Sequence, residues 1–304
     1  MPIKIPKDLP ANEALRAEKV YVIPDFLAET QDIRPLKVAI VNLMPTTLDT
    51  EMQLLRLLGN TPLQVDITLV RFESRKSHHA PNGHLETFYV NSKQAMKQRY
   101  DGLIITGAPV ETMPFENVDY WHELQELLDY SQHNVWSTLH ICWGAQAGLY
   151  HRYGICKQLL PKKLSGIFAH DIKNKDFPLF RGFDDEFLAP QSRYTESDKA
   201  QIEHEAQLTI QSESEKNGVF VVSAREGREV YVMGHLEYDP LTLDIEYKRD
   251  SAKGLAPALP ENYYPDNIPN AAPIVRWRAH AHLFFSNWLN YVYQETPYCL
   301  AYME

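Results

Sequence analysis

Apolar and polar positions in the first half of the chain follow a strand pattern and a helix pattern in turn. Residues 36–44 are almost continuously apolar and rich in β-branched side chains, which is typical of a parallel strand covered on both faces. Residues 48–60 carry leucine and methionine at helical spacing and end in Gly59-Asn60, a typical helix stop. Further strands are expected at 63–72, 101–107 and 135–141, and further helices at 118–132 and after residue 142.

Strands interleaved with helices indicate βαβ units. They therefore predict an α/β fold with a doubly wound, mostly parallel sheet. Right-handed crossovers place the carboxyl ends of parallel strands along one edge, so we expect any site at that edge.

The second half of the chain follows a different pattern. Residues 218–234 predict two strands joined by a turn at 225–227, and a helix is expected from about Pro240. The segment 255–273 contains five prolines and is interpreted as a loop or wrapping segment. Residues 275–294 predict a long aromatic helix that packs on the domain or across a subunit interface.

We interpret residues 1–304 as a single catalytic α/β domain. It would comprise an N-terminal extension (1–34), a core (35–254) and a wrapping C-terminal segment of proline-rich loop and helix (255–304). The extension, the proline-rich segment and the aromatic helix offer more apolar surface than one domain covers. A homodimer is therefore expected.

The composition narrows the classes of function. The chain has 304 residues, is 44% hydrophobic and carries a net charge of −10 without a lysine or arginine run. Neither nucleic acid nor an anionic membrane is an expected partner, because both are bound by cationic groups. No secretory signal, membrane span, disulfide framework or zinc spacing is apparent, and His78, His79 and His84 lie in a polar stretch without metal-ligand partners. We expect a cytoplasmic protein with no metal and no cofactor.

The sharpest chemical signal is Cys142, which directly follows an apolar strand. Gly144 lies two residues after Cys142, where a helix should begin. A strand, a cysteine and a glycine in this order are typical of a nucleophile elbow. A helix N-terminus favours the thiolate, the form of cysteine that attacks. Lone cysteines are more often buried structural residues, so the functional interpretation depends on partners.

Two partners, His235 and Glu237, close another expected strand, which begins at Glu229. Alternation along an extended segment would place the imidazole and the carboxylate on one side. Cys142, His235 and Glu237 would then supply a nucleophile, its base and the group that orients the base. The pair alone is a weak signal, but together with the elbow it becomes moderately specific.

A third strand end offers an oxyanion site. The backbone N–H groups of Gly107 and Ala108, with that of Trp143, could bind a developing oxyanion, although an ordinary strand-to-helix turn is an equally good interpretation of this segment alone. Together the three features resemble the class I glutamine amidotransferases. The chain departs from them at His140, where glycine is usual, and at Leu236, where proline is usual, and it contains no ammonia-accepting synthetase domain.

A closer resemblance covers essentially the whole chain. The chain is similar to the homoserine O-acyltransferases of methionine biosynthesis, the MetA family, in VNLMPTTLDTE, LRLLGNTPLQVDI, KLSGIFAH, FLAPQSRYTE, GHLEYDPLTLDIEYKRD and WRAHAHLFFSNWLNYVYQETPY. The resemblance implies an amidotransferase-like fold, an acyl-CoA donor, a thioester on the elbow cysteine and transfer to the hydroxyl of L-homoserine. A glutamine-hydrolysing amidotransferase and a non-enzymatic binding protein are the alternatives.

The resemblance also implies residue roles. It gives the triad residues the roles already named and places homoserine-binding groups at Lys163, Ser192 and Arg249. Arg249 has an independent argument, because a guanidinium is a bidentate match for the homoserine carboxylate. Lys163 and Ser192 rest on the resemblance alone and are interpreted as polar residues in loops that contain glycine and proline.

The family divides between acetyl-CoA and succinyl-CoA, and Glu111 is the expected selector. A succinyl group ends in a carboxylate, which Glu111 would displace and repel. Acetyl needs no such room, so we predict a homoserine O-acetyltransferase with acetyl-CoA as cosubstrate; an O-succinyltransferase of the same mechanism is the alternative. If Glu111 points to solvent, this argument has no force.

Overall fold

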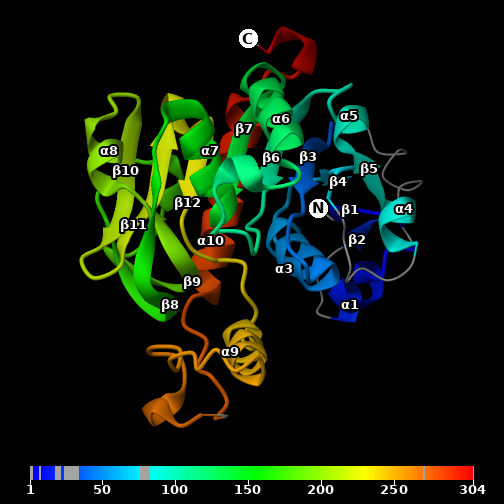
Figure 1. The fold of residues 1–304 in the computed structure, drawn as a ribbon. Helices are drawn as coiled ribbons and strands as arrows, with labels where there is room; N and C mark the ends of the chain where they lie inside the picture. Colours follow the sequence, from blue (N-terminus) through cyan, green and yellow to red (C-terminus); the bar gives the residue numbers. More distant parts are fainter. Residues whose placement is uncertain are drawn as a thin grey trace.

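One sheet with a parallel half and an antiparallel half organises the chain (Figure 1). The computed structural model describes residues 3–6, 8–17, 22–23, 34–75, 83–269 and 271–303. In this part the sheet has twelve strands in the order β2-β1-β4-β3-β6-β7-β12-β11-β10-β8-β9, with β5 beside β4. Neighbouring strands are parallel from β2 to β12 and antiparallel from β12 to β9.

The elements have the following bounds. The parallel strands are β1 (Ile3–Lys4), β2 (Val22–Ile23), β3 (Leu36–Val41), β4 (Val65–Arg71), β5 (Tyr89–Asn91), β6 (Tyr100–Ile105), β7 (Val135–Ile141) and β12 (Glu229–Val232). The antiparallel half adds β8 (Lys157–Ile172), β9 (Glu186–Ser197), β10 (Leu208–Ser214) and β11 (Gly218–Ala224). The α-helices are α1 (Ala11–Ala17), α3 (Thr47–Leu58), α4 (His84–Phe88), α5 (Ser92–Ala95), α6 (Trp121–Asn134), α7 (Trp143–Tyr153), α8 (Lys199–His204), α9 (Thr242–Ala252) and α10 (Arg278–Glu295).

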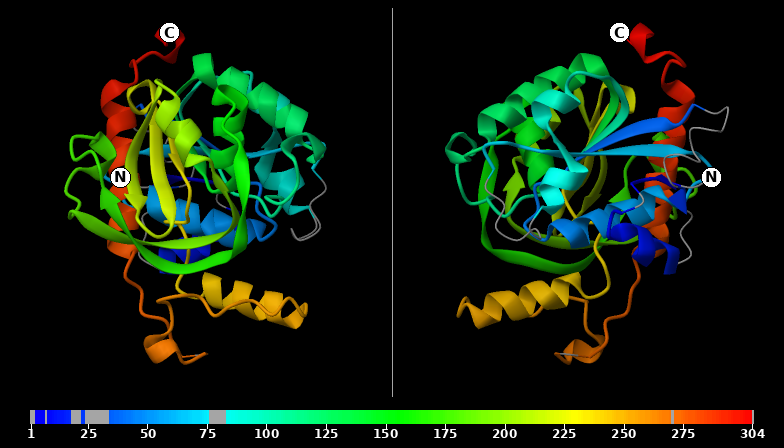
Figure 2. Two further views of the ribbon diagram at one scale, coloured as in Figure 1. Left: turned by 60° about the vertical axis from the view of Figure 1, so that its left-hand side comes forward. Right: turned by 90° about the vertical axis from the view of Figure 1, so that its right-hand side faces the viewer.

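Helices cover both faces of the parallel half (Figure 2). On one face α3 and α10 bury Leu54, Leu58 and Trp288 in a single cluster with the strands. On the other face α6 and α7 bury Leu124 and Trp143. The doubly wound arrangement that the sequence pattern predicted is therefore confirmed.

The aromatic C-terminal helix α10 packs on its own sheet. Trp288 lies against Gly102 of β6, where a Cβ atom would be 2.7 Å from Cη2 of the indole. The indole Nε1 donates to Oγ of Ser137 at 3.0 Å. The sequence left packing across a subunit interface open, but Phe284 and Phe285 are also buried within this chain. The buried aromatic face of α10 therefore no longer argues for a homodimer.

The long strands β8 and β9 were not expected, and Lys163 and Ser192 lie on them rather than in loops. Ser192 pairs with Ser165 of β8, and the register shifts between Leu159 and Leu164, next to Lys163. The loop interpretation was wrong because β8 is half-exposed over much of its length, which removes the apolar signal. Its pairing with β9 is a long-range contact that local sequence does not contain.

Helix α9 and the segment after it lie below the main body of the molecule (Figure 2). As expected, the described part of 255–273 contains no α-helix. It crosses β8 where Glu261 N donates to Ser165 O at 2.9 Å and Ile167 N donates to Glu261 O at 2.8 Å. Gly166 has φ +149°, and a Cβ atom there would lie 2.3 Å from Glu261 O, so the crossing requires glycine.

The N-terminal segment is described only in part. β1 pairs with β4, and α1 buries Leu15 in the same cluster as α3. Residues 1–2, 7, 18–21 and 24–33 lie outside the described residues. Among the described helices, none is long and apolar enough to cross a membrane.

Candidate active site

Cys142 stands on a strained turn between β7 and α7. Its backbone has φ +52° and ψ −115°, and its N–H donates to Val232 O at 2.7 Å. Gly144 makes the turn possible, because a Cβ atom there would lie 2.7 Å from Thr106 O and 2.8 Å from Ile105 O. A non-glycine residue at positive φ is costly and is typical of functional sites. The sequence predicted this elbow from the strand, the cysteine and the glycine.

The departure at His140 has a structural reason. Its ring is fully buried under the elbow, stacks on Tyr231 at 4.6 Å and occupies the space beside Gly148, where a Cβ atom would be 2.8 Å from Nδ1. Burial, reinforced by Arg152, holds the pKa of His140 well below its usual value, so the ring is neutral. His140 therefore packs the first turns of α7 against the sheet.

His235 and Glu237 meet beside the nucleophile. Nδ1 of His235 and Oε1 of Glu237 are 2.6 Å apart, and Cys142 lies within electrostatic reach of the imidazole. Burial opposes protonation of His235, but the neighbouring Cys142 and Glu237 outweigh it and raise the pKa of the imidazole well above its usual value. The imidazole can therefore hold the proton that the attacking thiol gives up.

The reason given for the pairing of His235 and Glu237 was wrong. β12 ends at Val232, and the two residues lie in the turn that follows it, so strand alternation does not align them. Instead, His235 N donates to Pro190 O of β9 at 3.0 Å, which fixes the turn against the antiparallel half.

The expected oxyanion residues surround Cys142. A Cβ atom on Gly107 would lie 3.3 Å from Cβ of Cys142 and 3.4 Å from Cε1 of His235, so the backbone of Gly107 borders both groups. Ala108 is buried next to it, and Trp143 is the first residue of α7. The turn after β6 and the N-terminus of α7 thus meet at the thiol, and the oxyanion role of their N–H groups stays a prediction.

Glu246 on α9 connects the groups expected to bind homoserine. Its Oε2 atom accepts a hydrogen bond from Oγ of Ser192 and lies 3.2 Å from Nζ of Lys163. Its Oε1 atom accepts from the hydroxyl of Tyr238 at 2.8 Å, and the Tyr238 ring stacks on His235 at 4.1 Å. Burial works against ionisation of Glu246, but Lys163 and the hydroxyl donors lower the pKa of its carboxyl, so it is charged.

Arg249 lies one helical turn beyond Glu246 on the same face of α9. Its guanidinium pairs with Asp250 at 2.8 Å, and Asp250 also binds Lys163 at 3.0 Å. The structure therefore brings Lys163, Ser192 and Arg249 together through two carboxylates that sequence reasoning missed. Glu246 could have been predicted from the sequence, because it lies three residues before Arg249 in an expected helix and therefore on the same face.

Glu111 points into the protein. Its Oε2 atom accepts a hydrogen bond from the backbone N–H of Tyr194 in β9 at 2.7 Å. Burial raises the pKa of Glu111, while Tyr194 N–H, His235 and Lys163 act in the opposite direction. The carboxyl group is thus partly buried, within electrostatic reach of the base and of Lys163.

Arg193 of β9 is a further residue that sequence reasoning missed. Only 1% of it is exposed, and its guanidinium donates to the carbonyl oxygens of Thr195 and Asn217. Burial lowers the pKa of Arg193, and the charges of Glu196, Cys142 and Glu111 oppose this shift. It places a buried cation within electrostatic reach of the nucleophile.

The structure corrects the expectation for His84. This residue is 5% exposed, and its Nε2 atom lies 2.9 Å from Oε1 of Glu51, so it is not part of a solvated loop. His78 and His79 lie outside the described residues. Within the described ranges, no group of three or more possible ligands could hold a metal ion.

A cysteine elbow on a parallel sheet, a histidine–carboxylate pair and a glycine turn define a protein of the class I glutamine amidotransferase-like fold. The chain superposes on a glutamine amidotransferase from Thermotoga maritima with a TM-score of 0.59 at 14% identity, over 86% of this chain and 99% of that one. A glutamine amidotransferase from Methylobacillus flagellatus gives a TM-score of 0.51 at 11% identity, over 85% of this chain and 95% of that one. At these identities the likeness concerns the fold alone.

The chain belongs to the homoserine O-succinyltransferase family, whose sequence model matches residues 2–298. It is 56% identical to a protein named homoserine O-acetyltransferase from Brevibacillus brevis, over 99% of this chain and 98% of the relative. Proteins of the same name from Desulfovibrio desulfuricans (56%, covering 99% and 96%) and Petrotoga mobilis (54%, covering 99% and 97%) are similar over the same extent.

Proposed function

We propose that this chain is a homoserine O-acetyltransferase. It transfers acetyl from acetyl-CoA to Cys142 and then to the hydroxyl of L-homoserine, in two steps that share one site. The observation that carries the chemistry is the arrangement of Cys142, His235 and Glu237 at the end of β7, within a family whose named members acylate homoserine.

In the first step, Sγ of Cys142 attacks the thioester carbonyl carbon of acetyl-CoA. The carbon–sulfur bond to CoA breaks, and His235 passes the proton it took from Cys142 to the departing CoA sulfur. Glu237 holds the imidazole by its Nδ1–H, so that the other ring nitrogen faces the thiol. The N–H groups of Gly107, Ala108 and Trp143 stabilise the oxyanion that forms in between.

In the second step, the hydroxyl of homoserine attacks the Cys142 thioester. His235 accepts the hydroxyl proton and returns it to the cysteine sulfur when the acyl bond breaks. Arg249 binds the homoserine carboxylate, and Lys163 and Ser192, held by Glu246, complete the site. No metal ion or resident cofactor is needed for either step.

Glu111 supports acetyl over succinyl as the transferred group. Its carboxylate is held by Tyr194 N–H within electrostatic reach of His235, and there it would obstruct the tail of a succinyl group. Two like charges a few ångströms apart in a partly desolvated pocket repel by several kcal/mol. The family is named for succinyl transfer, but the relatives at 54–56% identity are named acetyltransferases.

Mass spectrometry of the intact protein tests the covalent step. Acetyl-CoA without homoserine should release CoA in a burst and leave an acetyl adduct on Cys142, and added homoserine should remove it. Normal turnover without an adduct would contradict the thioester. Glutaminase activity without homoserine would instead support an amidotransferase.

Donor selection is tested with Glu111→Gly. The native enzyme should have a higher kcat/KM for acetyl-CoA than for succinyl-CoA, and the variant should gain at least about tenfold in relative preference for succinyl-CoA. Asp119→Gly, which removes an exposed carboxylate, is the control. A native preference for succinyl-CoA would make the acetyl assignment wrong.

We also propose that the enzyme acts as a homodimer in the cytoplasm. The exposed apolar side chains Leu255, Ile268 and Ile274 of the C-terminal segment support an interface. Light scattering should give about twice the monomer mass of 35.1 kDa at micromolar concentration. The monomer mass at that concentration would contradict the dimer.

A further inference from the structure

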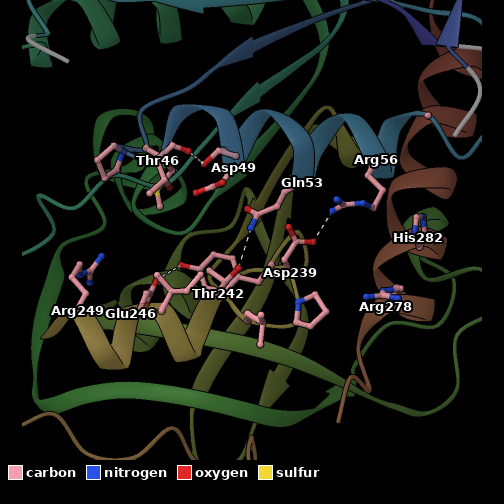
Figure 3. A pocket seen from close by; sticks show the side chains of 18 of the residues that line it. Thr46, Asp49, Gln53, Arg56, Asp239, Thr242, Glu246, Arg249, Arg278 and His282 are labelled. Carbon is pink, nitrogen blue, oxygen red and sulfur yellow. Dashed lines mark hydrogen bonds and ion pairs between the residues drawn. The ribbon is translucent and has the colours of Figure 1, made fainter. Parts of the chain in front are cut away.

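A cavity of about 880 Å³ lies between α3, α9 and α10, and Glu246 and Arg249 line it (Figure 3). Pockets of 300–1,000 Å³ hold ligands of drug size, whereas homoserine has only eight non-hydrogen atoms. The cavity is therefore far larger than the acceptor requires, and most of it has no role in binding homoserine.

One end of the cavity reaches the catalytic residues. Met44, which lines it, has its sulfur 3.7 Å from the position that a Cβ of Gly107 would take, and that position is 3.3 Å from Cβ of Cys142. Tyr238, another lining residue, stacks on His235. A thioester carbonyl at this end would therefore lie beside the nucleophile.

The opposite end is cationic. Arg56 from α3 and Arg278 and His282 from α10 line it together (Figure 3). These three side chains are close enough to interact electrostatically. Burial lowers the pKa of His282 most, and the positive charges of Arg278 and Arg56 lower it further. Asp239 also lies at this end and pairs with Arg56 at 2.6 Å, whereas the carboxylates of Asp49 and Glu246 line the cavity farther from Arg278 (Figure 3). A half-exposed pair of guanidiniums beside a neutral imidazole is a suitable surface for phosphate groups.

The distance between the two ends of the cavity can be estimated along helix α3. Thr46, at its N-terminus, and Arg56, in its last turn, both line the cavity and are ten residues apart, which corresponds to about 15 Å along the helix. The phosphopantetheine arm of CoA has the length of roughly five extended residues, or about 17 Å. An acyl group at Cys142 would thus place its diphosphate near Arg56 and Arg278.

Between the two ends, Gln53 on α3 donates to Oγ1 of Thr242 at 3.1 Å (Figure 3), and the cavity also has an apolar part. Leu241 and Ile245 line it and are 53% and 59% exposed, although they are large hydrophobic side chains. They lie on the α9 side, opposite α3. Such a surface suits the aliphatic part of a pantetheine arm, whose dimethyl group lies next to its phosphate end.

We propose that this cavity is the binding site of the acyl-CoA donor, with the thioester at the Met44 end and the phosphates of the nucleotide at Arg56, Arg278 and His282. The inference rests on the proposed function, because it names the site that the donor of that reaction occupies. It assigns Arg278 as a donor-binding residue that takes no part in the chemistry.

The test compares a whole donor with a truncated one in Arg278→Glu. Arg278 is exposed in the first turn of α10, where a carboxylate is favoured by the helix dipole, so the variant should fold. The KM for acetyl-CoA should rise about tenfold or more with kcat unchanged, while kcat/KM for acetyl-pantetheine, which lacks phosphate and nucleotide, stays within twofold.

Arg276→Glu is the matched control, since Arg276 is also exposed, lies two residues away and lines a different cavity beside β8. It should leave the KM for both donors unchanged. The inference is overturned if Arg278→Glu leaves the KM for acetyl-CoA unchanged, or if it lowers kcat/KM for acetyl-CoA and acetyl-pantetheine by the same factor. It is also overturned if Arg276→Glu raises the KM for acetyl-CoA as much as Arg278→Glu does.

A binding measurement separates this inference from the proposed function. Adenosine 3′,5′-bisphosphate should bind the native protein in calorimetry and bind Arg278→Glu about tenfold more weakly. If native enzyme acylates homoserine from neither donor, the proposed function fails, and calorimetry still decides whether the cationic end binds nucleotide phosphates. If adenosine 3′,5′-bisphosphate binds the native protein and Arg278→Glu with equal affinity, the proposed donor site is wrong.

Discussion

The two halves of the sheet hold their parts of the site in different ways. In the parallel half, β3, β6 and β7 are almost entirely buried, and close backbone packing at Gly144 and Gly107 sets the position of Cys142. In the antiparallel half, β8 is half-exposed, and Lys163 and Ser192 are positioned by side-chain contacts with α9. The comparison suggests that the first half carries the chemistry and the second half binds homoserine.

The largest effect is expected at the nucleophile, in the parallel half. Cys142→Ala should reduce kcat by roughly 10⁴-fold or more, because triad members act as a unit. The fold should be retained, since the side chain is small and 7% exposed. Rates with acetyl-CoA and homoserine, with circular dichroism for folding, check this.

Cys156→Ala is the control, because Cys156 is exposed. It should keep activity within about twofold. Substantial turnover in Cys142→Ala would show that Cys142 is not the nucleophile, and it would contradict the assignment of the chemistry to the parallel half.

A smaller effect, confined to one substrate, is expected from Glu246→Gln. The amide keeps the shape but loses the charge that pairs with Lys163 at 3.2 Å and orients Ser192. We expect kcat/KM for homoserine to fall about 10²-fold, a loss of charged hydrogen bonds worth roughly 3 kcal/mol, while the burst of CoA release is retained. Pre-steady-state kinetics separates the two steps.

Glu203→Gln, on the surface of α8, is the matched control and should change neither step. If Glu246→Gln slows the burst as much as the transfer to homoserine, then α9 also serves the chemistry. The division between the two halves would then be wrong.

A stability comparison tests the close packing behind the elbow. In Gly144→Ala the new Cβ atom meets the backbone oxygens of Thr106 and Ile105, which cannot move aside, and we expect a loss of about 2–3 kcal/mol. Gly154→Ala has open space but φ +68°, so about 1 kcal/mol is expected. Urea unfolding measures both, and equal losses would contradict the steric argument.

The smallest effect concerns acid stability of the antiparallel half. Burial lowers the pKa of His170 on β8 to about 3. Below pH 6.5 the unfolded chain therefore binds a proton that the folded chain does not, and stability falls as the pH falls toward 3. His170 contributes at most about 1.4 kcal/mol per pH unit to this fall.

His170→Phe should remove that contribution. Phe187 and Phe220 already flank the ring, so the core can accept an aromatic replacement, although Gln191 loses a partner. Urea midpoints at pH 7.5, 6 and 5 should show a shallower pH dependence than the native protein. His133→Phe, at an exposed position, should keep the native slope, and an unchanged slope in His170→Phe would contradict burial of a neutral ring.

The sequence allowed most of the parallel half to be predicted, because its strands are local apolar runs and its helices have local stops. The turn at 225–227 and the helix after Pro240 were also found this way. Strands β8 and β9 of the antiparallel half were missed, because a half-exposed strand with glycine and proline resembles a loop until its partner strand is known. Their pairing joins residues that are distant along the chain.

The site divides in the same way. Cys142 was predictable because a strand, a cysteine and a glycine are adjacent in sequence. His235 and Glu237 were found as a pair, but the turn that aligns them is held by Pro190 of β9, which no local pattern reveals. The inward orientation of Glu111 likewise depends on a backbone N–H from β9.

The sequence by itself determined the α/β class, the doubly wound half and the elbow, because these follow from hydrophobic period and from the few residues that a tight strand-to-helix turn permits. Only the tertiary structure decided that Lys163, Ser192 and Arg249 meet through Glu246 and Asp250, and that Arg249 and Arg278 line one cavity. Burial and charge pairing between distant segments are properties of the folded chain, and these set the pKa values and orientations on which binding depends.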